Sequence, residues 1–148
     1  MTTLIALAER VEGLQGPDRE VDGLIARTMG WHRVEPRHHH NRYGAWIAPQ
    51  DFIGIESDGR PRIDSLRGTE MHRHPPALTA SLDAVVALIA ERLPGWSSLL
   101  LWPDASSSSK ADASLTNGKL ETIMAAAKTP ALALLAAALR ALSKDTER

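Results

Sequence analysis

Cysteine is absent from the 148 residues of this sequence, and aromatic residues make up only 4% of it. The lack of cysteine excludes disulfide bonds, thiolate-bound zinc and thiol nucleophiles. No apolar run approaches the roughly 18 residues that a membrane-spanning helix needs. Glu9, Arg10 and Glu12 interrupt the apolar residues near the start of the chain, so we expect no signal peptide. These absences predict a cytoplasmic protein that acts away from membranes.

An excess of charge of either sign is also missing. The formal net charge is −1, which gives no general attraction to nucleic acids or anionic membranes. Gly54, Gly59 and Gly68 lack the spacing of a phosphate-binding loop, and residues 106–109, all serine, have no partnered histidine or aspartate signature. The remaining candidates for catalysis are carboxylates at predicted helix starts: Asp18, Glu20, Asp22 and Asp83. The helix dipole stabilises acidic residues at these positions, so they need no catalytic role. We therefore predict no catalytic residues and no enzyme activity.

Helical periodicity and capping residues are present in four segments. The predicted helices cover residues 4–14, 17–29, 79–93 and 129–142. The last begins with Thr129 and Pro130, a capping residue followed by a proline that the first helical position tolerates. Leucine and alanine make this helix apolar on nearly all sides, which is typical of a buried helix. A helix of this kind can be buried by its own sheet or by a second copy, so a homo-oligomer stays open.

Five short segments have the pattern of strands. Residues 43–48, 52–56 and 97–102 are apolar runs bounded by turn residues. Asn117-Gly118 is the preferred pair for a two-residue hairpin turn, which would place Leu115 opposite Leu120. The predicted order is ααββαβββα. We expect an α+β fold in one domain, residues 1–148, with a single antiparallel sheet of about five strands sandwiched between helical layers (α-β-α).

Three segments of the chain resemble one protein family. They are GPDREVDGLIARTMGW (16–31), TASLDAVVALIAERLPGW (79–96) and TPALALLAAALRAL (129–142). Together they resemble the phage ABA sandwich domain family, small phage and prophage proteins of unknown function. The resemblance implies a sheet between helical layers and a phage or prophage gene, hence the cytoplasm of a host cell, and it supplies no site residues. A long insertion, residues 32–76, departs from the pattern of the family.

That insertion contains or adjoins every histidine of the chain. A zinc ion takes three or four such ligands, and the candidates are His38, His40, His72 and His74. However, no cysteine supports them, and the HExxH spacing is absent. We therefore predict no metal site and no cofactor, with zinc bound by these histidines as the alternative.

The same stretch is rich in arginine, and with Trp31 directly before it supplies three aromatic residues that suit binding. The candidate surface comprises Trp31, Arg33, Arg37, Arg42, Tyr43, Trp46 and Arg73. Tryptophan and arginine are enriched at the energetic centres of protein interfaces. Arginine beside aromatic rings also suits phosphates and stacked bases, although acidic residues partly neutralise this segment.

Three functions follow from these features. The leading prediction is a non-enzymatic phage or prophage protein that binds another protein, such as a host factor, through the 31–76 segment. The first alternative is a binder of nucleic acids or nucleotides that uses the same arginine, histidine and tryptophan side chains. The second alternative is a metal-dependent enzyme with histidine ligands.

Overall fold

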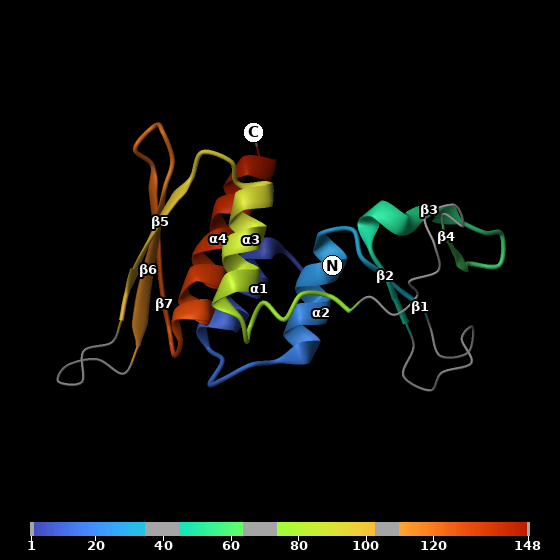
Figure 1. Cartoon of the computed structure of the whole chain (residues 1–148), viewed down its shortest axis with the longest axis horizontal. Coiled ribbons are helices and arrows are strands. Elements are labelled where there is room, and N and C mark those ends of the chain that lie inside the picture. The colour runs from blue at the N-terminus through green and yellow to red at the C-terminus, as the bar shows by residue number, and fades with distance from the viewer. Residues whose placement is uncertain (1, 35–44, 64–73, 103–109, 148) are drawn as a thin grey trace. The chain divides into compact units, whose positions relative to one another are not determined.

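The structure is a computed structural model, and it describes residues 2–34, 45–63, 74–102 and 110–147 (Figure 1). The helices are α1 (Leu4–Glu12), α2 (Arg19–Thr28), α3 (Leu82–Arg92) and α4 (Pro130–Thr146). The strands are β1 (His32–Val34), β2 (Ala45–Ile47), β3 (Phe52–Ile55), β4 (Pro61–Ile63), β5 (Ser97–Leu101), β6 (Ala111–Thr116) and β7 (Thr122–Ala127). A short 3₁₀ turn, η2 (Pro49–Asp51), precedes β3. The predicted α+β class is confirmed.

The chain divides into two compact units. The first unit comprises residues 1–24 and 77–148, and the second comprises residues 25–76. The boundary between them falls within α2, and the predicted insertion at 32–76 lies inside the second unit.

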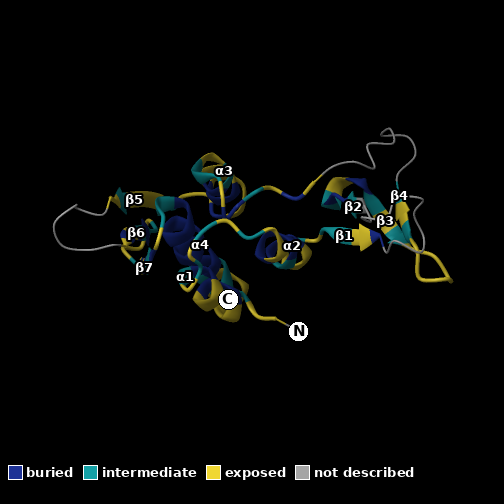
Figure 2. Cartoon of the chain, turned by 90° about the horizontal axis from the view of Figure 1, so that it is seen from below, coloured by how far each residue is buried: buried dark blue, intermediate teal, exposed yellow. Residues whose placement is uncertain are grey.

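Helix α4 is the centre of the first unit. Its side chains are buried from Ala131 to Leu139, so α4 is enclosed on nearly all sides, as its composition predicts (Figure 2). Thr129 caps it by accepting a hydrogen bond from the backbone N–H of Leu132, and Pro130 occupies the first turn. The helix packs on β6 and β7, while α1 and α3 pack against α4. Alanines allow these close approaches because they add little side-chain volume.

Strands β5, β6 and β7 form an antiparallel sheet in that order. One face of this sheet packs on α4 and buries Ala113, Leu115 and Ile123. The other face, here called the outer face, carries Leu99 and Met124, which are mostly exposed. Among the described helices, none covers the outer face, so the predicted α-β-α sandwich is not what this part of the chain shows.

The hairpin of β6 and β7 exists, but its predicted register is wrong. Leu115 pairs with Ile123 rather than Leu120, so the odd-numbered residues of β7 face α4. Asn117 accepts hydrogen bonds on its side-chain oxygen from the backbone N–H groups of Lys119 and Glu121. Leu120 takes the left-handed conformation with φ of 61°. The loop therefore has three residues and a bulge position instead of a two-residue turn.

A buried polar contact joins α2 to the segment before α3 within the first unit. The carboxylate of Asp22 accepts hydrogen bonds from the backbone N–H of Thr79 at 2.8 Å and from the guanidinium of Arg19 at 2.9 Å. The Thr79 hydroxyl in turn accepts a hydrogen bond from the backbone N–H of Asp18. Asp18 caps α2 because its side-chain oxygen accepts hydrogen bonds from the backbone N–H groups of Glu20 and Val21. These acidic residues therefore have structural partners.

The second unit is built on two short antiparallel ribbons. Strand β1 pairs with β2, and β3 pairs with β4. Val34 and Ile47 are buried together, and Phe52 and Ile63 pack against them. The ring of His32 stacks on Phe52 with 3.6 Å between centroids. A small apolar core thus joins the two ribbons.

The prediction of a single sheet of about five strands is wrong. The described strands form three separate sheets of two, two and three strands. The predicted strands at 43–48 and 52–56 are present as β2 and β3, but each pairs with a strand that the sequence pattern did not indicate. Both of those strands, β1 and β4, have only three residues, which is too short to show an alternating pattern.

Candidate binding surfaces

The pairing of β1 with β2 places an arginine directly beside a tryptophan. Arg33 lies opposite Trp46, while the neighbouring pair of His32 and Ile47 points to the apolar core of the second unit. Arg33 and Trp46 therefore share the side of the ribbon that faces away from this core. The guanidinium carbon of Arg33 lies 6.0 Å from the centroid of the Trp46 ring, within the range of a cation–π contact.

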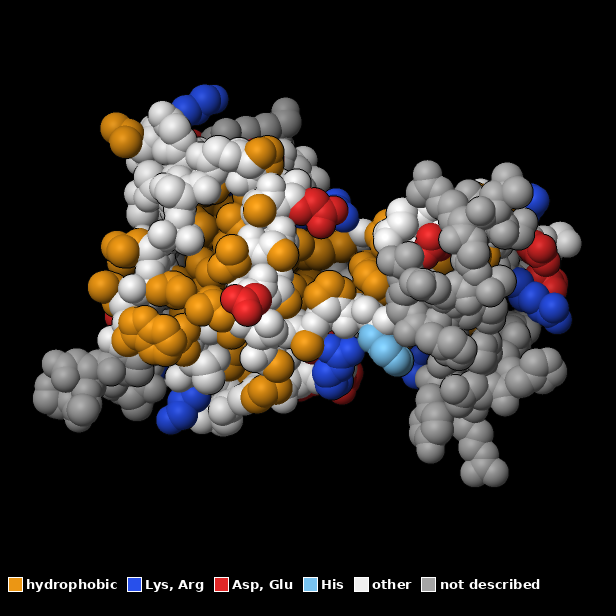
Figure 3. Space-filling model, in the orientation of Figure 1, with side chains coloured by type: hydrophobic (Ala, Val, Ile, Leu, Met, Phe, Trp, Pro, Cys, Tyr) orange, Lys and Arg blue, Asp and Glu red, His pale blue; other side chains and the backbone are white. Residues whose placement is uncertain are grey.

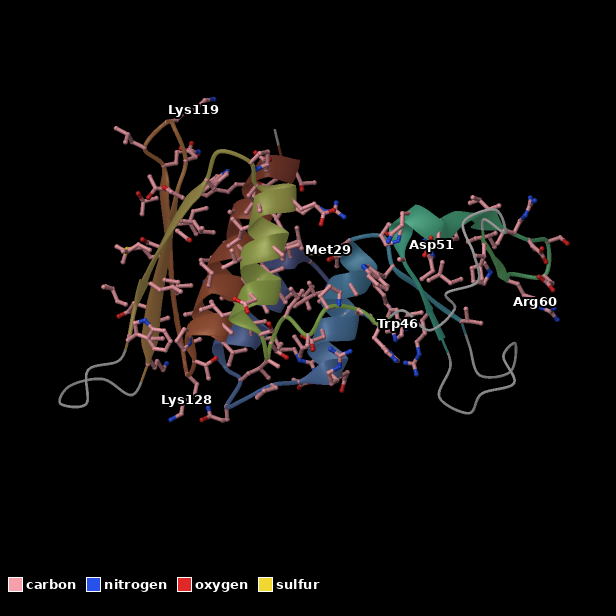
Figure 4. All side chains as sticks on the ribbon, in the orientation of Figure 1. Met29, Trp46, Asp51, Arg60, Lys119 and Lys128 are labelled. Atoms are coloured by element: carbon pink, nitrogen blue, oxygen red, sulfur yellow. The ribbon has the colours of Figure 1, made fainter. Side chains whose placement is uncertain are left out.

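A second arginine reaches the same ring from the end of α2. The guanidinium carbon of Arg27 lies 5.9 Å from the ring centroid of Trp46, whose position is labelled in Figure 4. The chain leaves α2 through Gly30, whose φ of 90° suits glycine. The backbone N–H of Trp31 donates a hydrogen bond to the carbonyl of Ala26, which closes the helix end. This cap turns the chain directly from α2 into β1.

The two arginines have no acidic partner within the described residues. Neither Arg27 nor Arg33 takes part in an ion pair there, whereas Arg60 is held by Asp58 at 2.9 Å. Residues 25–76 contain eight arginines and six acidic residues, a formal charge of +2. The cluster of Arg27, Arg33 and Trp46, called the RWR surface below, therefore offers two guanidinium groups to an anion beside a half-buried aromatic ring.

The structure brings together two of the predicted binding residues, Arg33 and Trp46. Trp31 is half-buried, and its backbone N–H donates a hydrogen bond to a carbonyl at the end of α2. The other four candidates lie outside the described residues: Arg37, Arg42, Tyr43 and Arg73. Arg27 was not predicted, because it lies in the helix that precedes the insertion. The glycine at position 30 was the available signal, since a capped helix end returns the chain towards its last turn.

Only one of the four candidate metal ligands, His74, lies within the described residues. His38, His40 and His72 lie outside them, and His74 is exposed. Within the described residues, no group of three or more histidine or acidic side chains could hold a metal ion. The stack on Phe52 gives His32 a packing role.

A second candidate surface lies on the three-stranded sheet of the first unit. Large apolar side chains are exposed there: Leu99 at 60%, Leu101 at 55%, Trp102 at 70% and Met124 at 68%. Figure 3 shows hydrophobic side chains gathered over this sheet. Exposed apolar side chains that lie together on one sheet are typical of interaction sites.

Comparison of the chain with protein-family models, curated proteins and solved structures finds no match. The resemblance to the phage ABA sandwich domain family therefore stays a prediction. Among the described residues, every helix is too short or too polar to cross a membrane.

Proposed function

We propose that this protein is a non-enzymatic binding protein whose RWR surface recognises an acidic segment of another protein. The observation that carries this proposal is the pair of guanidinium groups, free of carboxylate partners in the described residues, over the ring of Trp46. An arginine can hold a carboxylate with two parallel hydrogen bonds. The half-buried tryptophan beside it supplies apolar contact area.

Several features favour a protein partner over a nucleic acid. Both arginines already lie over the Trp46 ring, which leaves less of the ring for a base to stack on. The second unit contains no lysine, and its formal charge is only +2. Arginine and tryptophan together, with few lysines, are the composition of a protein interface. The resemblance to phage proteins supports a phage or prophage origin and a partner encoded by the host.

Binding of nucleic acids through the RWR surface remains the second candidate, because arginine beside an aromatic ring also suits single strands. It is tested by the fluorescence anisotropy of labelled single-stranded DNA and RNA at low and high salt. Our proposal predicts no binding that depends on Trp46. A salt-sensitive affinity that Trp46→Ala abolishes would replace the protein partner with a nucleic acid.

The protein partner is tested by affinity capture from a host lysate, with nuclease treatment, followed by mass spectrometry. The wild-type protein is compared with Arg33→Gln, which removes one guanidinium from the exposed side of β1. The matched control is Arg62→Gln, which removes an arginine that is also exposed, from β4 in the same unit. We expect a protein that is captured by the wild type and the control but lost with Arg33→Gln. Identical capture by all three proteins would refute the RWR surface as the binding site.

A further inference from the structure

We propose that β5 pairs with β5 of a second copy, so that two three-stranded sheets join into one antiparallel sheet of six strands. This surface belongs to the first unit, so the proposal does not depend on the RWR surface. Strand β5 is an edge of the described sheet, because it pairs only with β6. An unpaired edge exposes backbone N–H and C=O groups that another strand can use.

The two edges of this sheet differ in how they are protected. Strand β7, at the other edge, is contacted by α1. In Figure 2, α1 lies on the β7 side of α4, and α3 lies on the β5 side. Strand β5 has no charged residue, no proline and no bulge between Ser97 and Leu101. These are the features that natural sheets use to prevent edge pairing, and β5 has none of them.

The sequence around β5 complements itself when it is reversed. Residues 96–102 read WSSLLLW, with Leu99 at the centre. Antiparallel pairing about Leu99 places each tryptophan opposite a tryptophan, because Trp96 then faces Trp102 of the second copy. It also places Leu101 opposite Ser97, so that large side chains meet small ones. Aromatic pairs that lie directly opposite each other stabilise antiparallel pairing, and no like charges are brought together.

The hydrogen-bonding groups of β5 also suit this arrangement. The backbone N–H of Asn117 donates to the carbonyl of Glu121, so the odd-numbered residues of β6 bond to β7. By the alternation of an antiparallel ladder, Ser114 then bonds to its partner Leu99 in β5. The backbone groups of Ser98 and Leu100 must therefore point to the open edge. Pairing about Leu99 brings Ser98 opposite Leu100 of the second copy, and each such pair can exchange two hydrogen bonds.

The helical layer is compatible with the same symmetry. A two-fold axis perpendicular to the sheet keeps both helical layers on one side. Helix α3 lies on the β5 side of α4, and its exposed residues include the small apolar Val86, Ala87 and Ala90 as well as the charged Asp83, Glu91 and Arg92. Edge pairing therefore keeps the two copies of α3 on the same side of the joined sheet.

The test is the molar mass in solution, measured by light scattering after size exclusion over a range of concentrations. The wild-type full chain is expected to approach twice the mass of 16.1 kDa as concentration rises. Leu99→Lys should be monomeric, because it sets two ammonium groups against each other at the symmetry axis. Ser98→Pro should also be monomeric, because it removes an N–H that points to the open edge and leaves the bonds to β6 intact.

Met124→Lys is the matched control, because it adds the same charge to the outer face on β7, away from the proposed junction. It should remain dimeric, and circular dichroism should show native helix content for all three variants. A wild type that stays monomeric at the highest attainable concentration would overturn the proposal. So would a dimer that Met124→Lys dissociates and Ser98→Pro does not, because that result means packing of two outer faces. If Ser98→Pro is unfolded, a dimeric Leu99→Lys alone refutes edge pairing.

Discussion

At the scale of single residues, Asp22 is the most enclosed acidic side chain in the described part of the chain, with an exposed fraction of 0%. Its carboxylate accepts hydrogen bonds from the backbone N–H of Thr79 and from the guanidinium of Arg19. Asp22→Ala leaves that N–H without its acceptor in a buried place, so we expect a loss of about 2–4 kcal/mol in the free energy of unfolding. Urea denaturation followed by circular dichroism measures this loss.

The control for Asp22 is Glu20→Ala, two residues earlier in the same helix. Glu20 pairs with Arg10 at 3.3 Å, but its side chain is 75% exposed. Exposed ion pairs contribute about 0–1 kcal/mol, so the loss should be much smaller. Equal losses for the two variants would contradict the structural role assigned to Asp22.

Leu120 occupies a backbone conformation that favours glycine. Its φ is 61°, and its side chain is 85% exposed, so the side chain gains little from burial. Leu120→Gly should therefore stabilise the protein by up to about 1 kcal/mol, since it relieves a left-handed conformation that costs about 1–2 kcal/mol for other residues. Lys119→Gly, in the same loop, should give no gain. Thermal unfolding compares the two variants, and a lower melting temperature for Leu120→Gly would argue against the observed turn.

At the scale of elements, a pair of hydrogen bonds joins α4 to α1. The guanidinium of Arg140 binds both carboxylate oxygens of Glu12, one of them at 3.0 Å. The hydrogen bond to Glu12 is the main reason why the pKa of Arg140 is raised above its ordinary value, so the arginine stays charged. Both side chains are about one quarter exposed, so the pair is partly shielded from water.

A double-mutant cycle with Arg140→Lys and Glu12→Gln measures this link between the helices. Lysine cannot form two parallel hydrogen bonds, and glutamine lacks the negative charge of Glu12, so each single variant should lose about 1 kcal/mol. The coupling energy from urea denaturation should exceed about 0.5 kcal/mol. The matched pair is Arg10 with Glu20, which joins α1 to α2 at the surface and should couple more weakly. Equal coupling in the two cycles would show that the link from α4 to α1 has no special strength.

The helices could be predicted from the sequence because their signals are local. Thr129 and Pro130 identify the start of α4, and Ser81 caps α3 by accepting a hydrogen bond from the backbone N–H of Ala84. The sheets could not be predicted in the same way, because alternation in one strand does not identify its partner. The hairpin register depended on Asn117, whose side chain binds two backbone N–H groups and lengthens the loop. The preference of Asn-Gly for a two-residue turn therefore did not predict the longer loop.

The contacts within the candidate binding site could not be predicted from the sequence either. Arg33 and Trp46 could be proposed as binding residues from their chemical types alone. Their pairing depends on the register of β1 with β2, where each strand is only three residues long. Arg27 joins them through the capped end of α2, which is a contact between an element and the segment that follows it. Sequence patterns indicate such residues but do not indicate which of them meet.

At the scale of the whole molecule, the two units differ in charge and in the surfaces they offer. Residues 25–76 have a formal charge of +2, and the rest of the chain therefore carries −3 against a total of −1. The positive unit carries the RWR surface, and the other unit carries the open edge of β5. We therefore expect partner binding and self-association to be separable. Leu99→Lys should still capture the partner, and Arg33→Gln should still form the dimer.

The most direct test of the binding proposal is the affinity of the captured partner for three purified proteins, measured by isothermal titration calorimetry. The proteins are the wild type, Arg33→Gln and the matched control Arg62→Gln. Hydrogen bonds to charged groups contribute about 1.5–3 kcal/mol, so Arg33→Gln should raise the dissociation constant by about 10- to 100-fold. Arg62→Gln should change it by less than about twofold, as a surface charge away from the interface would. Equal weakening by both variants, or no weakening by either, would contradict recognition by the RWR surface.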